Sequence, residues 1–157
     1  MKRCFARGQG LPKLRFGLGG IMAACVIFLG STALADTDAE VNARKNALDV
    51  AGAFTNDGFK LRDGHWCGTV KPQDQALIAV NLFAGNQYWF AVGTPDPGRK
   101  VAVNVYNESG KLVTTQHYEA GEQAAAGFSP SDSGQYFVAV NLESGDPTNF
   151  CLIYSYK

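Results

Sequence analysis

The sequence predicts a mainly β protein, an eight-stranded antiparallel β-sandwich of jelly-roll type with one N-terminal α-helix. Three observations support this fold class. From residue 59 onward, short apolar runs are separated by clusters of Gly, Pro, Asn, Asp and Ser. Several of the runs alternate between apolar and polar residues, which is typical of a strand with one buried face. The turns between the runs are short, which favours antiparallel pairing.

Residues 1–35 are expected to be a signal peptide. They contain five Lys or Arg residues and no acid, and an apolar run from Phe16 to Ala35 ends in Ala33-Leu34-Ala35. A basic segment, an apolar segment and a small-residue site are typical of a secretory leader. We therefore expect cleavage after Ala35 and a periplasmic or extracellular protein. Because about 20 apolar residues can span a bilayer, a protein anchored in the membrane through residues 16–35 is the alternative.

The neutral net charge of the whole chain hides an acidic mature protein. Residues 36–157 contain nine basic and fourteen acidic residues, a net charge of −5. Such a chain is poorly suited to bind a phosphate backbone, so no nucleic-acid partner is expected. These residues contain no second long apolar run, so no stable membrane span is expected after cleavage.

Residues 36–58 are predicted to form the N-terminal helix, over about 38–55. Thr37 and Glu40 have the spacing of a capping box. Asn56-Asp57-Gly58 ends the pattern, since glycine adopts the left-handed conformation of a helix C-terminus. The apolar residues at helical spacing are Val41, Ala47, Leu48, Val50, Ala51 and Phe54. The stripe of Leu48, Ala51 and Phe54 is expected to pack on the rest of the protein or on a partner.

Residues 59–157 are predicted to form the sandwich domain. The eight expected strands are Trp66–Val70, Ala76–Phe83, Gln87–Val92, Val101–Tyr106, Leu112–Tyr118, Ala124–Phe128, Gln135–Leu142 and Phe150–Tyr156. Alternate residues, such as Val101, Val103 and Val105, are expected to face the opposing sheet. Because residues 76–82 are nearly all apolar, we expect that strand to be central in its sheet.

Two cysteines, Cys67 and Cys151, remain once the leader is removed, and they are expected to form a disulfide in an oxidising compartment. A nucleophilic Cys67 with His65 two residues away is one alternative, although no orienting partner is evident. A zinc site made by these three residues and His117 is another, but their spacing matches no structural zinc motif. No metal and no cofactor are therefore expected.

No catalytic motif is present, so the protein is expected not to be an enzyme. The sequence lacks a nucleophile elbow, a phosphate-binding loop and a metal-binding helix motif. The two histidines, His65 and His117, are interpreted as structural. A serine triad can be written from Ser129 or Ser133 with Asp132 and His117, but almost any chain of this size permits such a set.

Aromatic residues provide the candidate ligand contacts. If Tyr88 and Tyr136 point into the sandwich, Trp89 and Phe137 point outward, where they could stack on sugar rings or contact a protein partner. The opposite orientation would place Trp89 inside.

A weak echo of Ala-Val-Asn followed by Leu or Val also places asparagines at 81, 104 and 141. Asn81, Asn104 and Asn141 either reflect convergent strand ends or form a row of outward polar side chains.

Three stretches together resemble the bacterial pre-peptidase C-terminal domain family. They are Leu82–Phe90, Val103–Val113 and Phe128–Val138, which contain Gly85-Asn86-Gln87-Tyr88, Tyr106-Asn107-Glu108-Ser109-Gly110 and Pro130-Ser131-Asp132-Ser133-Gly134-Gln135-Tyr136. The likeness covers about residues 76–142. It implies a secreted β-sandwich of jelly-roll type, of the kind that is usually appended to peptidases and binds matrix or assists secretion. This chain departs from that pattern in having no attached peptidase, an added N-terminal helix and an expected disulfide.

The sequence thus favours a secreted or periplasmic non-enzymatic module for binding or envelope structure, with an unknown protein or polysaccharide partner. A lectin-like carbohydrate-binding module is one alternative. A small secreted hydrolase, or an inhibitor of one, is the other.

Overall fold

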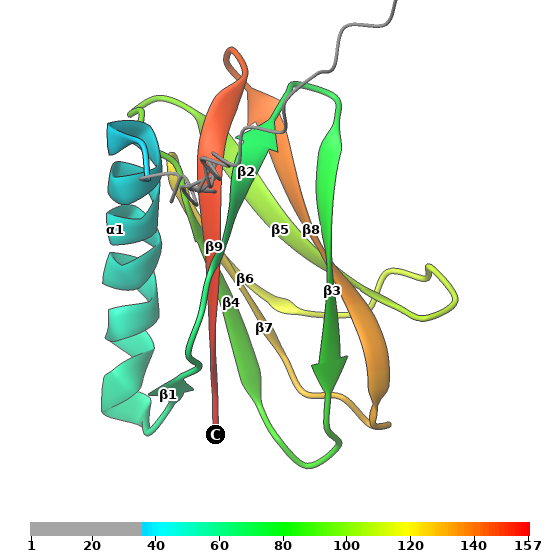
Figure 1. Cartoon of the computed structure of the whole chain (residues 1–157). Helices are drawn as coiled ribbons and strands as arrows, with labels where there is room; N and C mark the ends of the chain where they lie inside the picture. The colour runs from blue at the N-terminus through cyan, green and yellow to red at the C-terminus, as the bar shows by residue number, and fades with distance from the viewer. Residues whose placement is uncertain (1–35) are drawn as a thin grey trace, which may run out of the picture. The chain divides into compact units, whose positions relative to one another are not determined.

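The computed structural model describes residues 36–157, which form two β-sheets packed face to face with one helix on the outside of the larger sheet (Figure 1). The predicted signal peptide and the alternative membrane anchor fall on residues 1–35 and so lie outside the described residues. The elements are helix α1 (Asp38–Ala53), the 3-10 helix η1 (Phe54–Asp57), and strands β1 (Lys60–Leu61), β2 (Trp66–Val70), β3 (Gln75–Leu82), β4 (Tyr88–Gly93), β5 (Lys100–Asn107), β6 (Gln116–Ala120), β7 (Gln123–Phe128), β8 (Gly134–Ser144) and β9 (Thr148–Tyr156).

The predicted fold class is confirmed: the protein is an antiparallel β-sandwich preceded by one α-helix. The six-stranded sheet has the order β1-β9-β4-β7-β6, with β2 pairing along the same edge of β9 as β1. The three-stranded sheet has the order β3-β8-β5. Every ladder between strands is antiparallel.

Two details of the strand prediction were wrong. The described residues form nine strands rather than eight, because Lys60 and Leu61 pair with the C-terminal end of β9. The strand expected at 112–118 begins only at Gln116. Residues before it fold back on β5, where Leu112 makes a single bridge to Tyr106 and the Val113 N–H donates to the Val105 carbonyl over 2.9 Å.

The strand expected to be central, residues 76–83, is an edge strand. β3 pairs only with β8, which occupies the middle of its sheet. Its even-numbered residues Ile78, Val80 and Leu82 are buried, but Leu77 is 56 % exposed. The apolar run therefore forms a strand with one buried face. Its other face, which carries Leu77, is exposed to solvent.

The core between the sheets is built from alternate residues of both, as the sequence predicts. The buried cluster includes Tyr88, Phe90 and Val92 of β4, Val101, Val103 and Val105 of β5, Tyr136, Val138, Val140 and Leu142 of β8, and Phe150, Leu152 and Tyr154 of β9. The opposite face of the larger sheet carries a second cluster, in which Ala91, Ala125 and Ile153 pack against α1.

Small residues, rather than the expected leucine, dock α1 on the sheet. Ala43, Ala47 and Ala51 recur every four residues on one face of the helix and are fully buried. Leu48 is 42 % exposed, which corrects its predicted place in the packing stripe. Asn46 adds a hydrogen bond between the helix and the end of β4, since its Nδ2 donates to the Thr94 carbonyl over 2.7 Å. Side chains this short let the helix backbone lie close to the strands.

The predicted capping box starts the helix. The Glu40 N–H donates to Thr37 Oγ1 over 3.2 Å, and the Thr37 N–H donates to Glu40 Oε2 over 3.0 Å. At the other end, Gly58 has the left-handed φ of 85° that glycine adopts without strain.

We expect Thr37→Ala to lower the free energy of unfolding by about 1 kcal/mol, because it leaves a helix N–H without its acceptor. Urea denaturation of residues 36–157 measures this loss. Thr114→Ala, an exposed threonine outside the helix, is the control and should change stability by less than about 0.5 kcal/mol. Equal effects of the two substitutions would contradict a capping role.

Candidate ligand-binding surface

The two outer faces of the sandwich differ, because α1 covers the larger sheet while no described element covers β3, β8 and β5 (Figure 1). The residues of these three strands that point away from the core form the open face. They are Gln75, Leu77, Ala79 and Asn81 of β3, Gln135, Phe137, Ala139 and Asn141 of β8, and Ala102, Asn104 and Tyr106 of β5. These eleven residues are uncharged; the charged residues of the three strands are Lys100 and Glu143, which continue the face beyond Asn141.

An apolar strip with an aromatic pair occupies the centre of the open face. Phe137 lies between Ala79 on β3 and Tyr106 on β5, each directly opposite it in the ladders. In the next row, Ala139 lies between Leu77 and Asn104 in the same way. Directly opposed residues on one face of a sheet are close enough for their side chains to pack together.

Amide side chains lie at both ends of this strip. At one end Gln75 is opposite Asn141, and at the other Asn81 is opposite Gln135. Beyond the first end, Lys100 Nζ lies 2.6 Å from Glu143 Oε2, and this hydrogen-bonded ion pair raises the pKa of Lys100. The strip is therefore apolar in the middle, neutral and polar at its ends.

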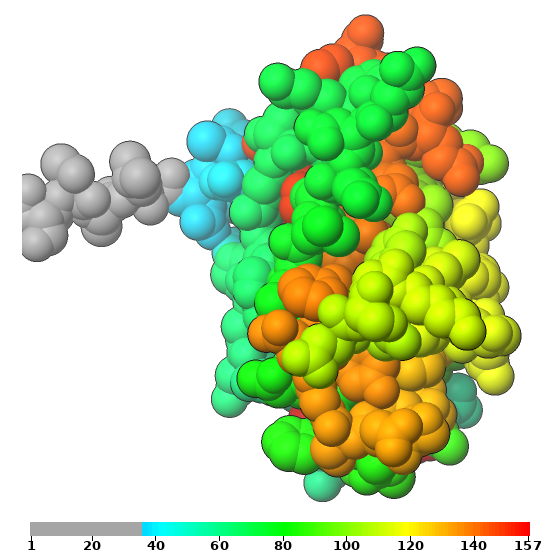
Figure 2. Space-filling view, turned by 90° about the vertical axis from the view of Figure 1, so that its right-hand side faces the viewer, coloured from blue at the N-terminus to red at the C-terminus, as the bar shows by residue number. Residues whose placement is uncertain are grey.

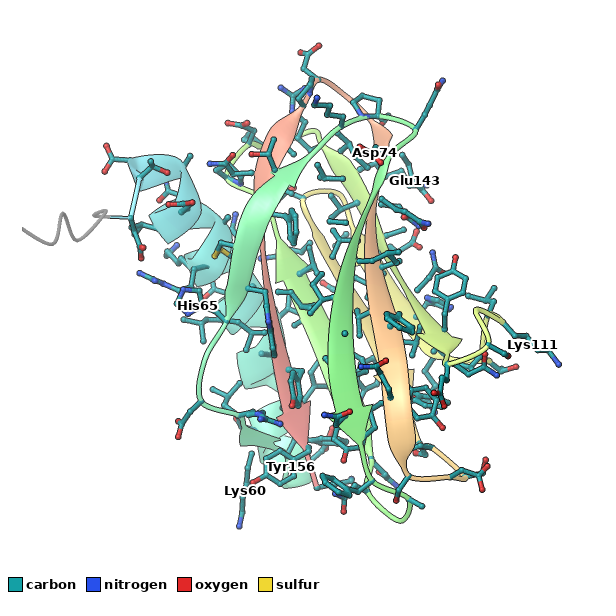
Figure 3. The ribbon with its side chains drawn as sticks, turned by 45° about the vertical axis from the view of Figure 1, so that its right-hand side comes forward. Lys60, His65, Asp74, Lys111, Glu143 and Tyr156 are labelled. Carbon is teal, nitrogen blue, oxygen red and sulfur yellow. A yellow bond between two sulfur atoms is a disulfide. The ribbon has the colours of Figure 1, made fainter. Side chains whose placement is uncertain are left out.

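A groove of about 310 Å³ crosses the open face beside the aromatic pair. It is lined by Gln75, Leu77, Tyr106, Glu108, Gly110 and Phe137. Figure 2 shows this side of the molecule, where β3, β8 and the hairpin at residues 107–113 meet, and Figure 3 labels Lys111 near the hairpin tip.

The hairpin beside the groove is held in place by its own hydrogen bonds. The Gly110 N–H donates to the Asn107 carbonyl over 2.9 Å, and Asn107 Oδ1 accepts from the Lys111 N–H over 2.9 Å. Gly110 has a φ of 76°, which favours glycine at this turn. One wall of the groove is thus a closed turn rather than an open loop.

The three echoed asparagines all lie on the open face, but they do not form one row. Asn104 is opposite Ala139 and Asn141 is opposite Ala102, so these two asparagines are diagonal neighbours. Asn81 is six residues away from Asn141 along the register of β8, roughly 20 Å. Only Asn104 and Asn141 are therefore placed to contact one small ligand together.

Of the two predicted ligand-facing aromatics, the structure places only Phe137 on the open face, where it is half-buried. Trp89 points away from the sandwich core as expected, but on the other sheet, where its ring stacks on Phe54 at 4.1 Å and 9°. A Cβ at Gly127 would lie 2.8 Å from the Trp89 ring, so the indole also lies flat on β7. Trp89 therefore contributes to packing around the end of α1.

Sequence reasoning missed Tyr106 and Leu77 as candidate contacts. The signal for Tyr106 was present, because inward Val103 and Val105 require the next residue to point outward. Leu77 was missed because its nearly all-apolar strand was expected to be central in its sheet, and none of the apolar residues of that strand was considered as an exposed contact.

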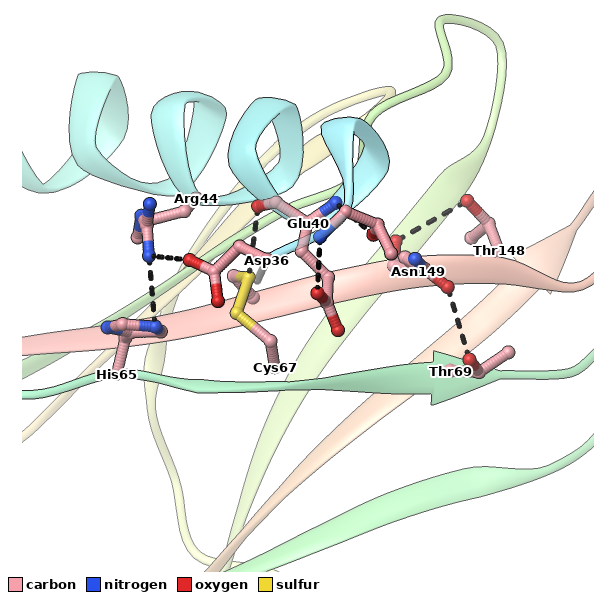
Figure 4. Close-up of a disulfide and its surroundings, with 10 residues drawn as sticks. Asp36, Glu40, Arg44, His65, Cys67, Thr69, Thr148 and Asn149 are labelled. Carbon is pink, nitrogen blue, oxygen red and sulfur yellow. Dashed lines mark hydrogen bonds and ion pairs between the residues drawn. A yellow bond between two sulfur atoms is a disulfide. The ribbon is translucent and has the colours of Figure 1, made fainter. Parts of the chain in front are cut away.

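The predicted disulfide is confirmed, and it joins the two cysteines directly across the β2–β9 ladder (Figure 4). The Cα atoms of Cys67 and Cys151 are 4.1 Å apart. His65 lies beside Arg44, with 3.2 Å between its Nε2 and the Arg44 Nη1, and the same nitrogen of Arg44 is 2.5 Å from Asp36 Oδ2. The disulfide leaves no free thiol at Cys67, so the alternative of a nucleophilic Cys67 is wrong.

The residues of the serine triad that the sequence permits form hydrogen bonds with other residues instead. His117 Nε2 is 2.7 Å from Thr115 Oγ1, while Ser133 Oγ accepts from the Ala84 N–H over 2.9 Å. Asp132 accepts from its neighbour Ser131 over 2.8 Å. No hydrogen bond joins these three residues to one another in the part of the chain that the structure describes. Nor do residues 36–157 contain a group of three or more His, Cys, Asp or Glu side chains placed to hold a metal ion.

Comparison with known proteins found no family model that matches the chain and no similar curated protein. Over residues 36–157, neither helix has the length and apolarity that crossing a bilayer requires.

Proposed function

We propose that the protein is a secreted, non-enzymatic binding module and that its open face binds an uncharged polysaccharide. The observation that carries this proposal is the Phe137–Tyr106 pair with amides at both ends of its strip. The apolar C–H faces of sugar rings pack on aromatic rings, and amide side chains both donate to and accept from sugar hydroxyls. The eleven residues of the strip and its amide ends are uncharged, and Lys100 and Glu143 beyond them pair with each other, which favours a neutral glycan over an ionic partner.

The length of the face suits an extended polymer. The amides at its two ends are six residues apart along β8, roughly 20 Å, so several sugar rings fit between them. The groove beside Tyr106 gives such a chain a fixed path between the hairpin and β3. The closed turn of the hairpin limits the conformational cost of binding.

Secretion is supported by the composition of residues 1–35 and by the disulfide, since disulfides persist mainly in oxidising compartments. The resemblance to pre-peptidase C-terminal domains agrees with an extracellular binding role, and we propose a distant relationship to that family. A protein partner is the competing possibility for the open face.

We expect the Phe137→Ala/Tyr106→Ala protein to bind its polysaccharide about fivefold to 150-fold more weakly, because each of the two lost aromatic contacts removes about 0.5–1.5 kcal/mol. Retention of residues 36–157 on insoluble cellulose, chitin and xylan identifies the ligand, and depletion isotherms give the affinities. Circular dichroism checks that the variant is folded.

Tyr118→Ala is the matched control, because Tyr118 is 45 % exposed but lies on β6 of the other sheet. It should bind like the wild type. No retention on any of the neutral polysaccharides would overturn the proposal and favour a protein partner. Equal weakening by the control variant would show that the open face is not the contact.

A further inference from the structure

A second pocket, of about 270 Å³, lies where Arg62 and the C-terminal end of β9 meet the end of β3. Its lining includes Arg62, Asn86, Tyr88, Tyr154 and Tyr156, together with Phe83, which is 60 % exposed. Tyr156 is labelled near this end of the sandwich in Figure 3. The pocket uses none of the aromatic residues of the open face.

Two buried tyrosine hydroxyls in this pocket have hydrogens without an acceptor. Tyr88 is 4 % exposed, and its oxygen already accepts from the Phe83 N–H over 3.0 Å and from Asn86 Nδ2 over 3.1 Å. Tyr154 is 2 % exposed, and its oxygen accepts from Arg62 Nη1. Within residues 36–157, neither hydroxyl donates to a protein atom. A phenol carries one donor hydrogen and two lone pairs, so both groups have a donor left for a ligand.

Arg62 supplies a positive charge beside these hydroxyls. Its guanidinium lies 5.3 Å from the centre of the Tyr154 ring, and its backbone N–H donates to the Tyr154 carbonyl over 3.0 Å. Arg62 takes part in none of the ion pairs formed within residues 36–157, although that segment has an excess of acidic residues. Most of its five N–H donors are therefore available.

The Tyr154 hydroxyl remains a donor at neutral pH. Burial raises the pKa of Tyr154 above its ordinary value of 10.0, although the nearby Arg62 charge partly opposes the shift. A ligand in this pocket must therefore supply hydrogen-bond acceptors to the two tyrosine hydroxyls. Because Arg62 is the one guanidinium among the described residues that line the pocket, a ligand with a single negative charge is favoured. A carboxylate fits both conditions, because it is an acceptor-only group with the geometry of the guanidinium fork.

We infer that this pocket binds the carboxylate of an acidic sugar, with Arg62 pairing with the carboxylate and Tyr88 and Tyr154 donating to its oxygens. The exposed rings of Phe83 and Tyr156 offer apolar surface for the sugar ring. Asn81, which also lines the pocket, offers an amide to its hydroxyls. This site adjoins the open face at Asn81 but shares none of its aromatic contacts, Phe137 and Tyr106.

Titration of residues 36–157 with sodium glucuronate, followed by NMR chemical shifts, tests the site. We expect shifts confined to the pocket residues with glucuronate and none there with glucose at the same concentration. Arg62→Gln should weaken glucuronate binding at least about tenfold, since hydrogen bonds to charged groups are the stronger kind. Tyr154→Phe keeps the ring beside Arg62 and removes only the hydroxyl, so it should weaken binding roughly threefold or more.

Lys60→Gln is the matched control, because it removes the same charge from β1 at the same end of the molecule but does not line the pocket. Equal weakening by Lys60→Gln and Arg62→Gln would overturn the site in favour of general charge attraction. Equal shifts with glucose would overturn the role of the carboxylate. Tighter binding of a short peptide with a free C-terminus would overturn the acidic sugar. Tyr88→Phe provides a second test of the donor set if Tyr154→Phe does not fold.

Discussion

We expect the Cys67→Ala/Cys151→Ala protein to lose about 4 to 5 kcal/mol of unfolding free energy, because the disulfide closes a very long loop. The two cysteines are 84 residues apart in sequence, and the loop between them contains every strand from β3 to β8. In the chain-entropy model, such a cross-link removes that much conformational freedom from the unfolded chain. For a domain of this size the melting temperature should fall by roughly 15 °C.

The position of the bond adds to its importance. β2 pairs with β9 and with no other described strand, so the disulfide fastens an edge of the larger sheet. Cys151 is fully buried, and alanine is the suitable replacement because a serine hydroxyl would lack a partner there. Thermal and urea unfolding of residues 36–157 measure the loss. Wild-type protein unfolded under a reducing agent should reproduce it.

Thr69→Ala/Asn149→Ala is the matched control for this prediction. Thr69 and Asn149 face each other in the same ladder, and their side chains are joined by a 3.1 Å hydrogen bond rather than a covalent bond. Removing such a cross-strand pair should cost no more than about 1 kcal/mol. If the cysteine variant lost no more than this control, the disulfide would not be constraining the unfolded chain.

The period-2 pattern was sufficient to predict the core, since alternation depends only on neighbouring residues. Val101, Val103 and Val105 alternate with less apolar positions, and they face the opposing sheet as expected. Sheet order depends on distant pairing, which no local pattern encodes. β3 is an edge strand because its partner β8 lies more than 50 residues later and pairs with β5 on its other side. The apolar composition of residues 76–82 could not show this.

The same distinction between local pattern and distant contacts applies to the candidate sites. Strand parity correctly placed both Phe137 and Trp89 away from the core, but it could not show that Phe54 would stack on Trp89 and leave Phe137 open. The carboxylate pocket had no sequence signal, because Arg62 and Tyr154 are 92 residues apart and meet only through the pairing of the chain near β9. Contacts between distant segments decide which outward residues are accessible.

The packing of α1 also depends on a close contact with Gly93, which a hydrophobicity pattern cannot predict. The expected stripe of Leu48, Ala51 and Phe54 was wrong for Leu48, and the helix docks mainly through alanines on a glycine of the sheet. A Cβ built at Gly93 would lie 2.4 Å from the backbone nitrogen of Ala47 and 2.6 Å from the carbonyl oxygen of Ala43. Gly93 is therefore the residue of β4 that permits the close approach of α1.

We expect Gly93→Ala to lower the free energy of unfolding by about 1–3 kcal/mol, because the added methyl meets backbone atoms that cannot rotate away. The helix must move outward, which exposes Ala47 and Ile153 and weakens the stacking of Phe54 on Trp89. Urea denaturation measures the loss of stability. A red shift of tryptophan emission and faster amide exchange in α1 would report the displacement directly.

Gly52→Ala is the matched control, because it adds the same methyl to a glycine of α1 that has nothing within 4 Å of the new atom. Alanine is the better helix former, so this variant should be more stable by about 0.5–1 kcal/mol. If the two substitutions change the free energy of unfolding in opposite directions, α1 is an integral layer of the domain, docked by close contact. Unchanged stability and unchanged α1 exchange in Gly93→Ala would instead make the helix a loosely attached appendage, and the outer face of the larger sheet would then be a second surface open to ligands.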